Sequence, residues 1–176
     1  MMLKCLGAAL VLISAPGLGL WLAGQWKERL RQLEKLRQMI YFLKGEITYS
    51  HAPLAEALER VGRRSGGPAG QMFIRTAERI CGQEGESLQE IWAQETRRMA
   101  AETRNLPFTK EDLEQLAALG EHLGYLDLDM QERTLLLYLE QLDLSIGYLQ
   151  RHRQEKCRLY TSLGVMGGIF LVIVMC

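Results

Sequence analysis

The chain has 176 residues, of which 21 are basic and 21 acidic, and 48% of its residues are hydrophobic. This length allows one folded domain with membrane anchors, and the balanced charge indicates no particular class of partner. The four cysteines form no CxxC pair, so the sequence predicts neither a metal site nor a disulfide framework. We expect no cofactor.

The N-terminal segment is predicted to be a membrane anchor. Residues 5–24 carry no charged side chain, and about 20 such residues suffice for a helix to span a bilayer. A cleaved secretory signal is the alternative, but Trp21 would stand where cleavage after Ala23 requires a small residue. We therefore expect residues 1–24 to form a retained N-terminal transmembrane helix.

A long amphipathic helix is predicted to follow the anchor without a break. Its apolar side chains recur at spacings of 3, 4, 3 and 4, which places them on one helix face. They are Leu33, Leu36, Ile40, Leu43 and Ile47. The helix is expected to end near Ser50, because His51 and Ala52 precede Pro53, which suits the first position of a new helix.

Four shorter helices are predicted in the middle of the chain. The first follows Pro53, and the glycine-rich stretch 62–70 is expected to be a loop. This stretch lacks the lysine and Ser/Thr of a phosphate-binding loop, which argues against a nucleotide site. Helices are then predicted over 71–81, 88–104 and 110–123, the last two with capping patterns at Ser87 and Thr109. Gly120 and Gly124 are expected to bracket a turn before the N-cap Asp129.

The last helix is predicted to run from Met130 to the end of the chain. Its main apolar row has spacings of 4, 3, 4 and 3 and comprises Leu135, Leu139, Leu142, Ile146 and Leu149. A second row, with Leu137, Leu144 and Tyr148, is an alternative inward face. Residues 159–176 carry no charge, so we expect a C-terminal transmembrane helix there.

The first and last helices are predicted to pack antiparallel, because their main rows run in mirror order. Burial of such side chains contributes roughly 1.5–3 kcal/mol each, more than surface charge pairs, so hydrophobic contact should set the register. The predicted pairs are Leu33 with Leu149, Leu36 with Ile146, Ile40 with Leu142, Leu43 with Leu139 and Ile47 with Leu135.

Basic residues follow the first predicted span and precede the second, and such residues favour the cytoplasmic side. Residues 25–158 are therefore expected to form a cytoplasmic helical bundle. The basic cluster within 151–158 abuts an apolar span, which indicates a lipid-facing role and no nucleic-acid partner. Small residues recur every four positions in both spans and predict close packing with each other or with a neighbouring subunit, which leaves a homo-oligomer open. They are Ala15, Gly19, Ala23, Gly164 and Gly168.

Acidic residues gather in the second half of the predicted bundle. Residues 102–143 carry ten acidic and three basic side chains, whereas residues 27–44 carry two acidic and six basic ones. Two other interpretations remain, a solvated face and a metal site near residue 127 that includes Glu132. We expect the acidic stretch to bind a basic partner surface through Glu111, Asp112, Glu114, Glu121, Asp127 and Asp129.

No catalytic constellation is predicted. The histidines His51, His122 and His152 are scattered, and none has an evident nucleophile or paired carboxylate beside it. The sequence therefore favours a non-enzymatic protein.

Three segments together closely resemble the stage III sporulation protein AB family of endospore-forming bacteria. They are residues 31–58, residues 118–131 with the motif ALGEHLGYLDLDMQ, and residues 156–174. The soluble part is in turn similar to the cytoplasmic domain of the inner-membrane platform proteins of type II secretion and type IV pilus machines, through PLAEAL at 53–58 and LGEHLGYLDLDMQ at 119–131. Platform proteins usually carry two such domains and more spans.

The resemblance implies an all-α, six-helix cytoplasmic bundle and a role as a membrane adaptor in the sporulation channel between mother cell and forespore. It further implies a secretion-type ATPase of the same operon as partner, together with other membrane components of the channel, in the mother-cell membrane around the forespore. A generic membrane-tethered helical scaffold and a membrane enzyme are the alternatives. Capture of the ATPase would distinguish the adaptor from the scaffold.

Overall fold

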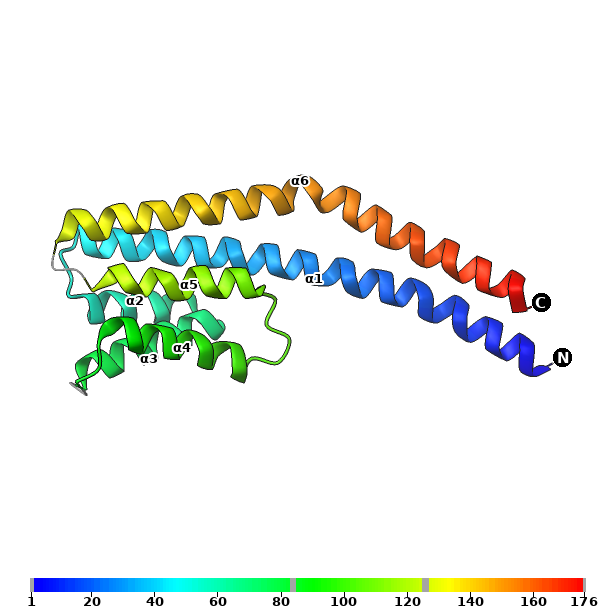
Figure 1. The fold of residues 1–176 in the computed structure, drawn as a ribbon, viewed down its shortest axis with the longest axis horizontal. Helices are drawn as coiled ribbons and strands as arrows, with labels where there is room; N and C mark the ends of the chain where they lie inside the picture. The colour runs from blue at the N-terminus through cyan, green and yellow to red at the C-terminus, as the bar shows by residue number, and fades with distance from the viewer. Residues whose placement is uncertain (1, 83–84, 125–126, 176) are drawn as a thin grey trace. The chain divides into compact units, whose positions relative to one another are not determined.

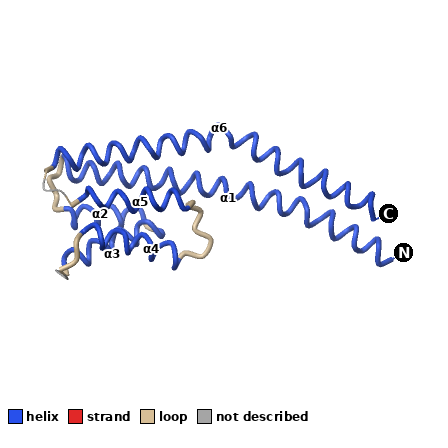
Figure 2. Tube along the Cα trace, in the orientation of Figure 1, coloured by secondary structure: helices blue, strands red, loops and turns tan. Residues whose placement is uncertain are grey.

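The structure, a computed structural model, describes residues 2–82, 85–124 and 127–175, and the side chains of residues 24–82, 85–124, 127–152 and 166. The described residues form six helices joined by turns and loops, with no strand, as the sequence predicts (Figure 1, Figure 2). The helices are α1 (Met2–Thr48), α2 (Leu54–Ser65), α3 (Gly67–Cys81), α4 (Leu88–Glu102), α5 (Lys110–Leu123) and α6 (Leu128–Met175).

The chain divides into two compact units. One comprises Met1–Arg31 with Ile146–Cys176, and the other comprises Gln32–Ser145. The short helices α2 to α5 belong to the second unit, whereas α1 and α6 contribute to both. The expected domain boundaries at residues 25 and 158 stay a prediction.

Most side chains of the two predicted membrane spans lie outside the part of the chain that the structure describes. Among the described residues, no helix combines the length and the apolar character needed to cross a membrane.

Both main apolar rows of the long helices are buried, as predicted. On α1 every side chain from Leu33 to Ile47 in the row is at most 2% exposed, and on α6 the row from Leu135 to Leu149 is also buried. The alternative row lies outside, because Leu137 is 62% exposed and Leu144 is 66% exposed. The first row of α6 is therefore the one that faces the core.

Ion pairs between α1 and α6 support the antiparallel arrangement within the second unit. Lys44 Nζ lies 3.0 Å from Glu132 Oε1, and Arg37 pairs with Asp143 about two turns earlier along α1 and about three turns farther along α6. The order of the pairs reverses along the two helices. The residue-by-residue register of the apolar rows stays a prediction.

We predict that cysteines placed at Ile40 and Leu142 form a disulfide on mild oxidation, after replacement of the four native cysteines. Both side chains are buried, and the mirror order of the rows places them opposite each other. Non-reducing electrophoresis with thiol counting measures the bond. Cysteines at Ile40 and Leu137 are the control and should stay reduced, since Leu137 points outward. Preferential cross-linking of the control pair would contradict the register.

The glycine-rich stretch 62–70 is mostly helical, so the predicted loop is wrong. Only Gly66 interrupts the two helices, and both it and Gly67 have positive φ angles, of 60° and 72°. Gly62 and Gly70 serve packing, because a Cβ on either would lie 2.7 Å from the carbonyl oxygen of the other. Two glycines make the turn, and two allow α2 and α3 to pack closely.

Both predicted capping boxes are present, and their helices begin where the sequence indicates. The Ser87 side chain accepts from the Glu90 amide, and the Thr109 side chain accepts from the Asp112 amide. Hydrogen bonds with Ser87 lower the pKa of Glu90. The fourth helix ends at Glu102, two residues before the predicted end, and Asn105 follows with a φ of 63°.

The predicted N-cap of the last helix is wrong by two residues. Asp127 precedes α6, and its Oδ1 accepts a hydrogen bond from the Asp129 amide, while its carbonyl accepts from Gln131. Asp129 therefore lies in the first turn. Asp127 is the acidic residue that can reach the second amide of the helix, which is what capping requires.

Gly120 is buried inside α5, so the prediction that it bracketed a turn is also wrong. A Cβ at Gly120 would lie 2.5 Å from Cδ1 of Trp92 and 2.7 Å from its Cβ. The indole is fully buried, donates a 2.6 Å hydrogen bond from Nε1 to the Leu116 carbonyl, and packs against Phe73 at 5.2 Å between ring centroids. Gly120 is needed for this close approach of α4 and α5.

A buried carboxylate also joins α3 to α4. Glu95 is 2% exposed and accepts from Arg75 at 2.7 Å and from Arg79 at 3.1 Å. Loss of Glu95 would leave the two arginines without this partner, which costs stability. The group therefore favours the observed pairing of α3 with α4.

We predict that Gly120→Ala destabilises the protein by about 1–3 kcal/mol, because the added methyl overlaps rigid atoms of Trp92. Chemical unfolding followed by helical circular dichroism measures the change. Gly45→Ala is the matched control, since no atom lies within 4 Å of its Cβ position in α1. It should be neutral or slightly stabilising through helix propensity. Equal stability of both variants would contradict the role assigned to Gly120.

Candidate interaction surface

The acidic residues predicted to bind a partner lie on α5 and at the start of α6. Glu111, Glu114 and Glu121 are exposed, and their spacings of 3 and 7 place them on one face of α5. Asp127 and Asp129 are exposed where α6 begins, at the same end of α5 as Glu121. The fold thus presents five of the six predicted carboxylates along α5 and its junction with α6.

The sixth residue, Asp112, is used inside the fold. It is 7% exposed, and its Oδ2 accepts a 2.8 Å hydrogen bond from the Thr109 amide. Asp112 therefore completes the capping box of α5, and its substitution would test helix stability together with any contact.

Some exposed acids also contribute to local stability. Glu111 lies in the first turn of α5 and Asp129 in the first turn of α6, where the helix dipole favours negative charge. Lys110 pairs with Glu114 at 3.4 Å, but both side chains are well exposed, so this pair contributes little to stability. Glu121 lies outside the first turn of α5, so neither capping nor the helix dipole accounts for an acidic side chain at this position.

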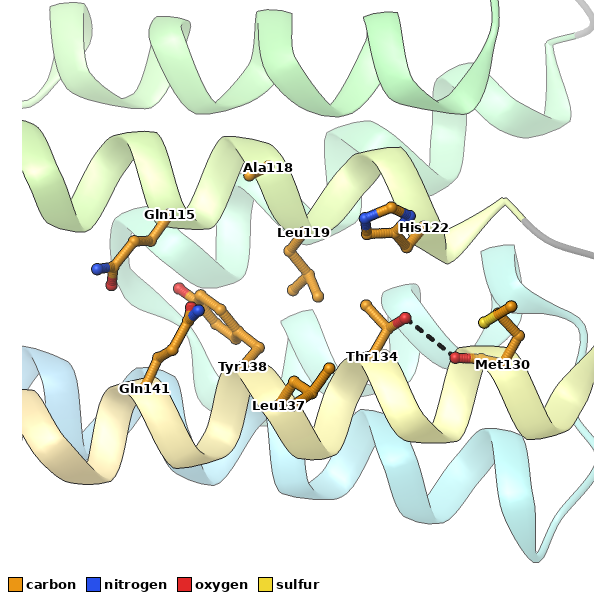
Figure 3. A pocket seen from close by; sticks show the side chains of 9 residues that line it. All are labelled: Gln115, Ala118, Leu119, His122, Met130, Thr134, Leu137, Tyr138 and Gln141. Atoms are coloured by element: carbon orange, nitrogen blue, oxygen red, sulfur yellow. Dashed lines mark hydrogen bonds between the residues drawn. The ribbon is translucent and has the colours of Figure 1, made fainter.

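An open groove of about 470 Å³ lies beside these acids, between α5 and α6. Gln115, Ala118 and His122 project into it from α5, and Thr134, Leu137 and Gln141 project into it from α6 (Figure 3). Leu119, Met130 and Tyr138 complete the lining. The groove combines apolar side chains with amide groups, which is the composition of a helix-binding surface as well as of a small-molecule site.

A buried hydrogen bond joins the two helices next to this surface. Gln131 on α6 donates from Nε2 to the carbonyl of Leu123 at 2.9 Å, and Gln131 is largely buried. This carbonyl belongs to the last turn of α5, where acceptors have no partner within the helix. Gln131 therefore ties the end of α5 to the first turn of α6.

The hydroxyl of Tyr138 is buried at the base of the groove and is without a hydrogen-bond partner in the described structure. Burial raises the pKa of this phenol, and the nearby Asp112 carboxylate raises it further. Tyr138 therefore remains neutral beneath the groove.

The carboxylates considered for a metal do not gather. Glu132 is taken by Lys44, and this hydrogen bond raises the pKa of Lys44. Over the part of the chain that the structure describes, no three His, Cys, Asp or Glu side chains are arranged to hold a metal ion. Cys81 is a free, exposed thiol.

The remaining positions considered in the sequence are the small residues of the predicted spans and the three histidines. The small residues of the predicted spans lie outside the side chains that the structure describes, namely Ala15, Gly19, Ala23, Gly164 and Gly168. His51 follows α1 with a φ of 48°, His122 lines the groove, and the His152 ring is stacked beside Tyr148 with ring centroids 4.3 Å apart. The histidines are distant in the sequence and occupy different elements.

Sequence reasoning missed the groove itself. Leu137 was recognised as part of a second row, but Gln115 and Ala118 gave no sign of a shared surface. The available signal is that α6 carries apolar residues on two faces, which requires either a central place in the bundle or a second apolar face that stays exposed.

Comparison with known proteins places this fold in a family. The family model for stage III sporulation protein AB matches residues 4–176. The chain belongs to this family. It is 26% identical over 174 residues to stage III sporulation protein AB of Bacillus subtilis (strain 168), and the match covers 99% of each chain.

A solved structure of stage III sporulation protein AB (SpoIIIAB) is also similar. Its TM-score is 0.64 at 26% sequence identity, and the match covers 73% of this chain and 98% of that one. The helical bundle is thus shared within the family, and this chain is a sporulation protein.

We predict that Gln131→Ala destabilises the protein by about 1–2 kcal/mol, because it leaves the Leu123 carbonyl without its buried donor. Thermal and chemical unfolding measure the loss. Gln141→Ala removes the same side chain from an exposed position on α6 and should have little effect. A neutral Gln131→Ala would show that the α5–α6 junction does not depend on this bond.

Proposed function

We propose that this sporulation protein is a non-enzymatic membrane adaptor of the channel between mother cell and forespore, and that it couples a cytoplasmic secretion-type ATPase to the membrane assembly. The observation that carries the proposal is the exposed acidic surface on α5 and the start of α6, within a bundle whose first and last helices extend toward the uncharged ends of the chain.

The membrane part of the proposal rests on charge and length. Residues 1–24 and 159–176 span the mother-cell membrane around the forespore, and residues 25–158 face the cytoplasm, where the flanking basic residues favour them. The small residues of the two spans then pack against each other, against other membrane components of the channel, or against a second copy of the chain.

The adaptor role follows from helix continuity. α1 has 47 residues and α6 has 48, and each is one helix from the bundle toward its terminus. A soluble partner that binds the bundle would therefore be linked to both predicted spans through continuous helix. The acidic surface lies on α5 and α6, so the partner would contact one of these two long helices directly.

We predict that charge reversal of Glu111, Glu114 and Glu121 to lysine weakens capture of the ATPase by about tenfold or more at low salt, because it places like charges on both surfaces. Pull-down and surface plasmon resonance with the full chain in nanodiscs measure the binding.

The control reverses Glu56, Glu59 and Glu78 on α2 and α3, which changes net charge equally on other exposed or half-exposed positions. Circular dichroism verifies that both variants are folded. Unchanged ATPase binding in the α5 variant would contradict the assigned surface. Failure of the unmodified protein to capture the ATPase would favour a membrane-tethered scaffold.

A further inference from the structure

Helix α6 carries a second heptad row that its own bundle does not use. The row runs through Met130, Thr134, Leu137, Gln141 and Leu144 at spacings of 4, 3, 4 and 3, the same pattern as the buried row. Its leucines are well exposed, and Met130 is also exposed. A row with this period packs against another helix at a shallow angle.

Helix α5 supplies a matching row on the other side of the groove. Gln115, Ala118 and His122 follow one another at spacings of 3 and 4, and all three line the groove opposite Thr134 and Leu137 (Figure 3). On both helices, the residue that follows a row member faces inward. Leu119 follows Ala118 on α5, Tyr138 follows Leu137 on α6, and both are buried at the groove floor.

The outer rims of the groove are predominantly acidic. The residue that precedes each member of a row lies on the flank that a docked helix would meet. These residues are Glu114, Ala117 and Glu121 on α5, and Asp129, Arg133, Leu136, Glu140 and Asp143 on α6. Five of the eight are carboxylates and one is basic. Asp143 pairs with Arg37, and the other four carboxylates leave a groove that is complementary to a helix with basic flanks.

We propose that the α5–α6 groove binds an amphipathic helix of a partner protein, with an apolar heptad row flanked by Lys and Arg. The exposed row from Met130 to Leu144 is about 21 Å long at 1.5 Å per residue, which corresponds to four turns of a partner helix. The inference rests on the proposed function, in that this helix would be the element through which the soluble partner engages the acidic surface.

A second copy of the chain fits the groove less well. A two-fold pairing of grooves would place the Glu114 and Glu121 rims near the same acidic rims of the other copy, and like charges at an interface oppose association. A basic partner helix removes this repulsion.

The test uses the full chain in phosphatidylcholine nanodiscs and a fluorescent 18-residue model peptide. The peptide carries Leu at positions a and d of each heptad and Lys at the flanking positions e and g. A scrambled peptide of the same composition lacks the apolar row. Empty nanodiscs are the blank. Fluorescence anisotropy should show about tenfold or tighter binding of the amphipathic peptide, because only it can bury the exposed leucines.

Variants then locate the binding site. L137S combined with L144S should weaken peptide binding by about tenfold, whereas Y41S should change it by less than about twofold. Tyr41 is also exposed but lies on α1, away from the residues that line the groove, so it controls for a general loss of surface hydrophobicity. Equal binding of the scrambled peptide, or no loss in the double variant, would overturn the proposal.

Two further measurements distinguish this proposal from self-association through the groove and from the proposed adaptor function. If sedimentation shows a dimer that L137S with L144S converts to a monomer, a second copy occupies the groove and the proposal is wrong. If the ATPase binds the unmodified chain and the double variant equally, the adaptor function stands and the groove inference fails. If the peptide binds through the row but the ATPase is not captured, the groove inference stands and the proposed function fails.

Discussion

The contact between Trp92 and Gly120 is the constraint on which the position of the candidate interaction surface depends. The indole occupies the space where any side chain at residue 120 would lie, and its nitrogen donates to a carbonyl one turn earlier in α5. α5 is therefore held against α4 by shape and by a buried hydrogen bond together. Because α5 forms one side of the groove and carries most of the acidic face, this contact also determines which α5 side chains remain exposed.

Helix α6 divides its two apolar rows between two tasks. One row completes the core with α1, while the other stays open beside α5. A helix that is apolar on two faces normally lies in the middle of a bundle, and here the second face is accessible instead. Exposed apolar surface of this kind usually marks an interaction site, which agrees with a protein whose proposed task is to join a soluble partner to a membrane assembly.

The acidic residues separate into structural and available groups only when their partners are known. Asp112 and Asp127 cap helices, Glu95 is enclosed by two arginines, and Glu132 pairs with Lys44. Glu111, Glu121 and Asp129 remain on the surface. An acidic composition over residues 102–143 is thus partly a requirement of folding, and the surplus is what a basic partner would meet.

The sequence by itself determined the helical class, the number of helices, the inward row of α1, the two candidate rows of α6, and the starts of α4 and α5. Those features depend on residues within one or two turns, through periodicity and capping. It could not determine the roles of Gly62, Gly70 and Gly120, because a glycine that makes a turn and a glycine that admits a neighbouring helix look alike until the neighbour is in place. The groove needed the tertiary structure for the same reason. Gln115 and Leu137 are brought to one surface only by the packing of α5 on α6, and periodicity within either helix says nothing of the distance between them.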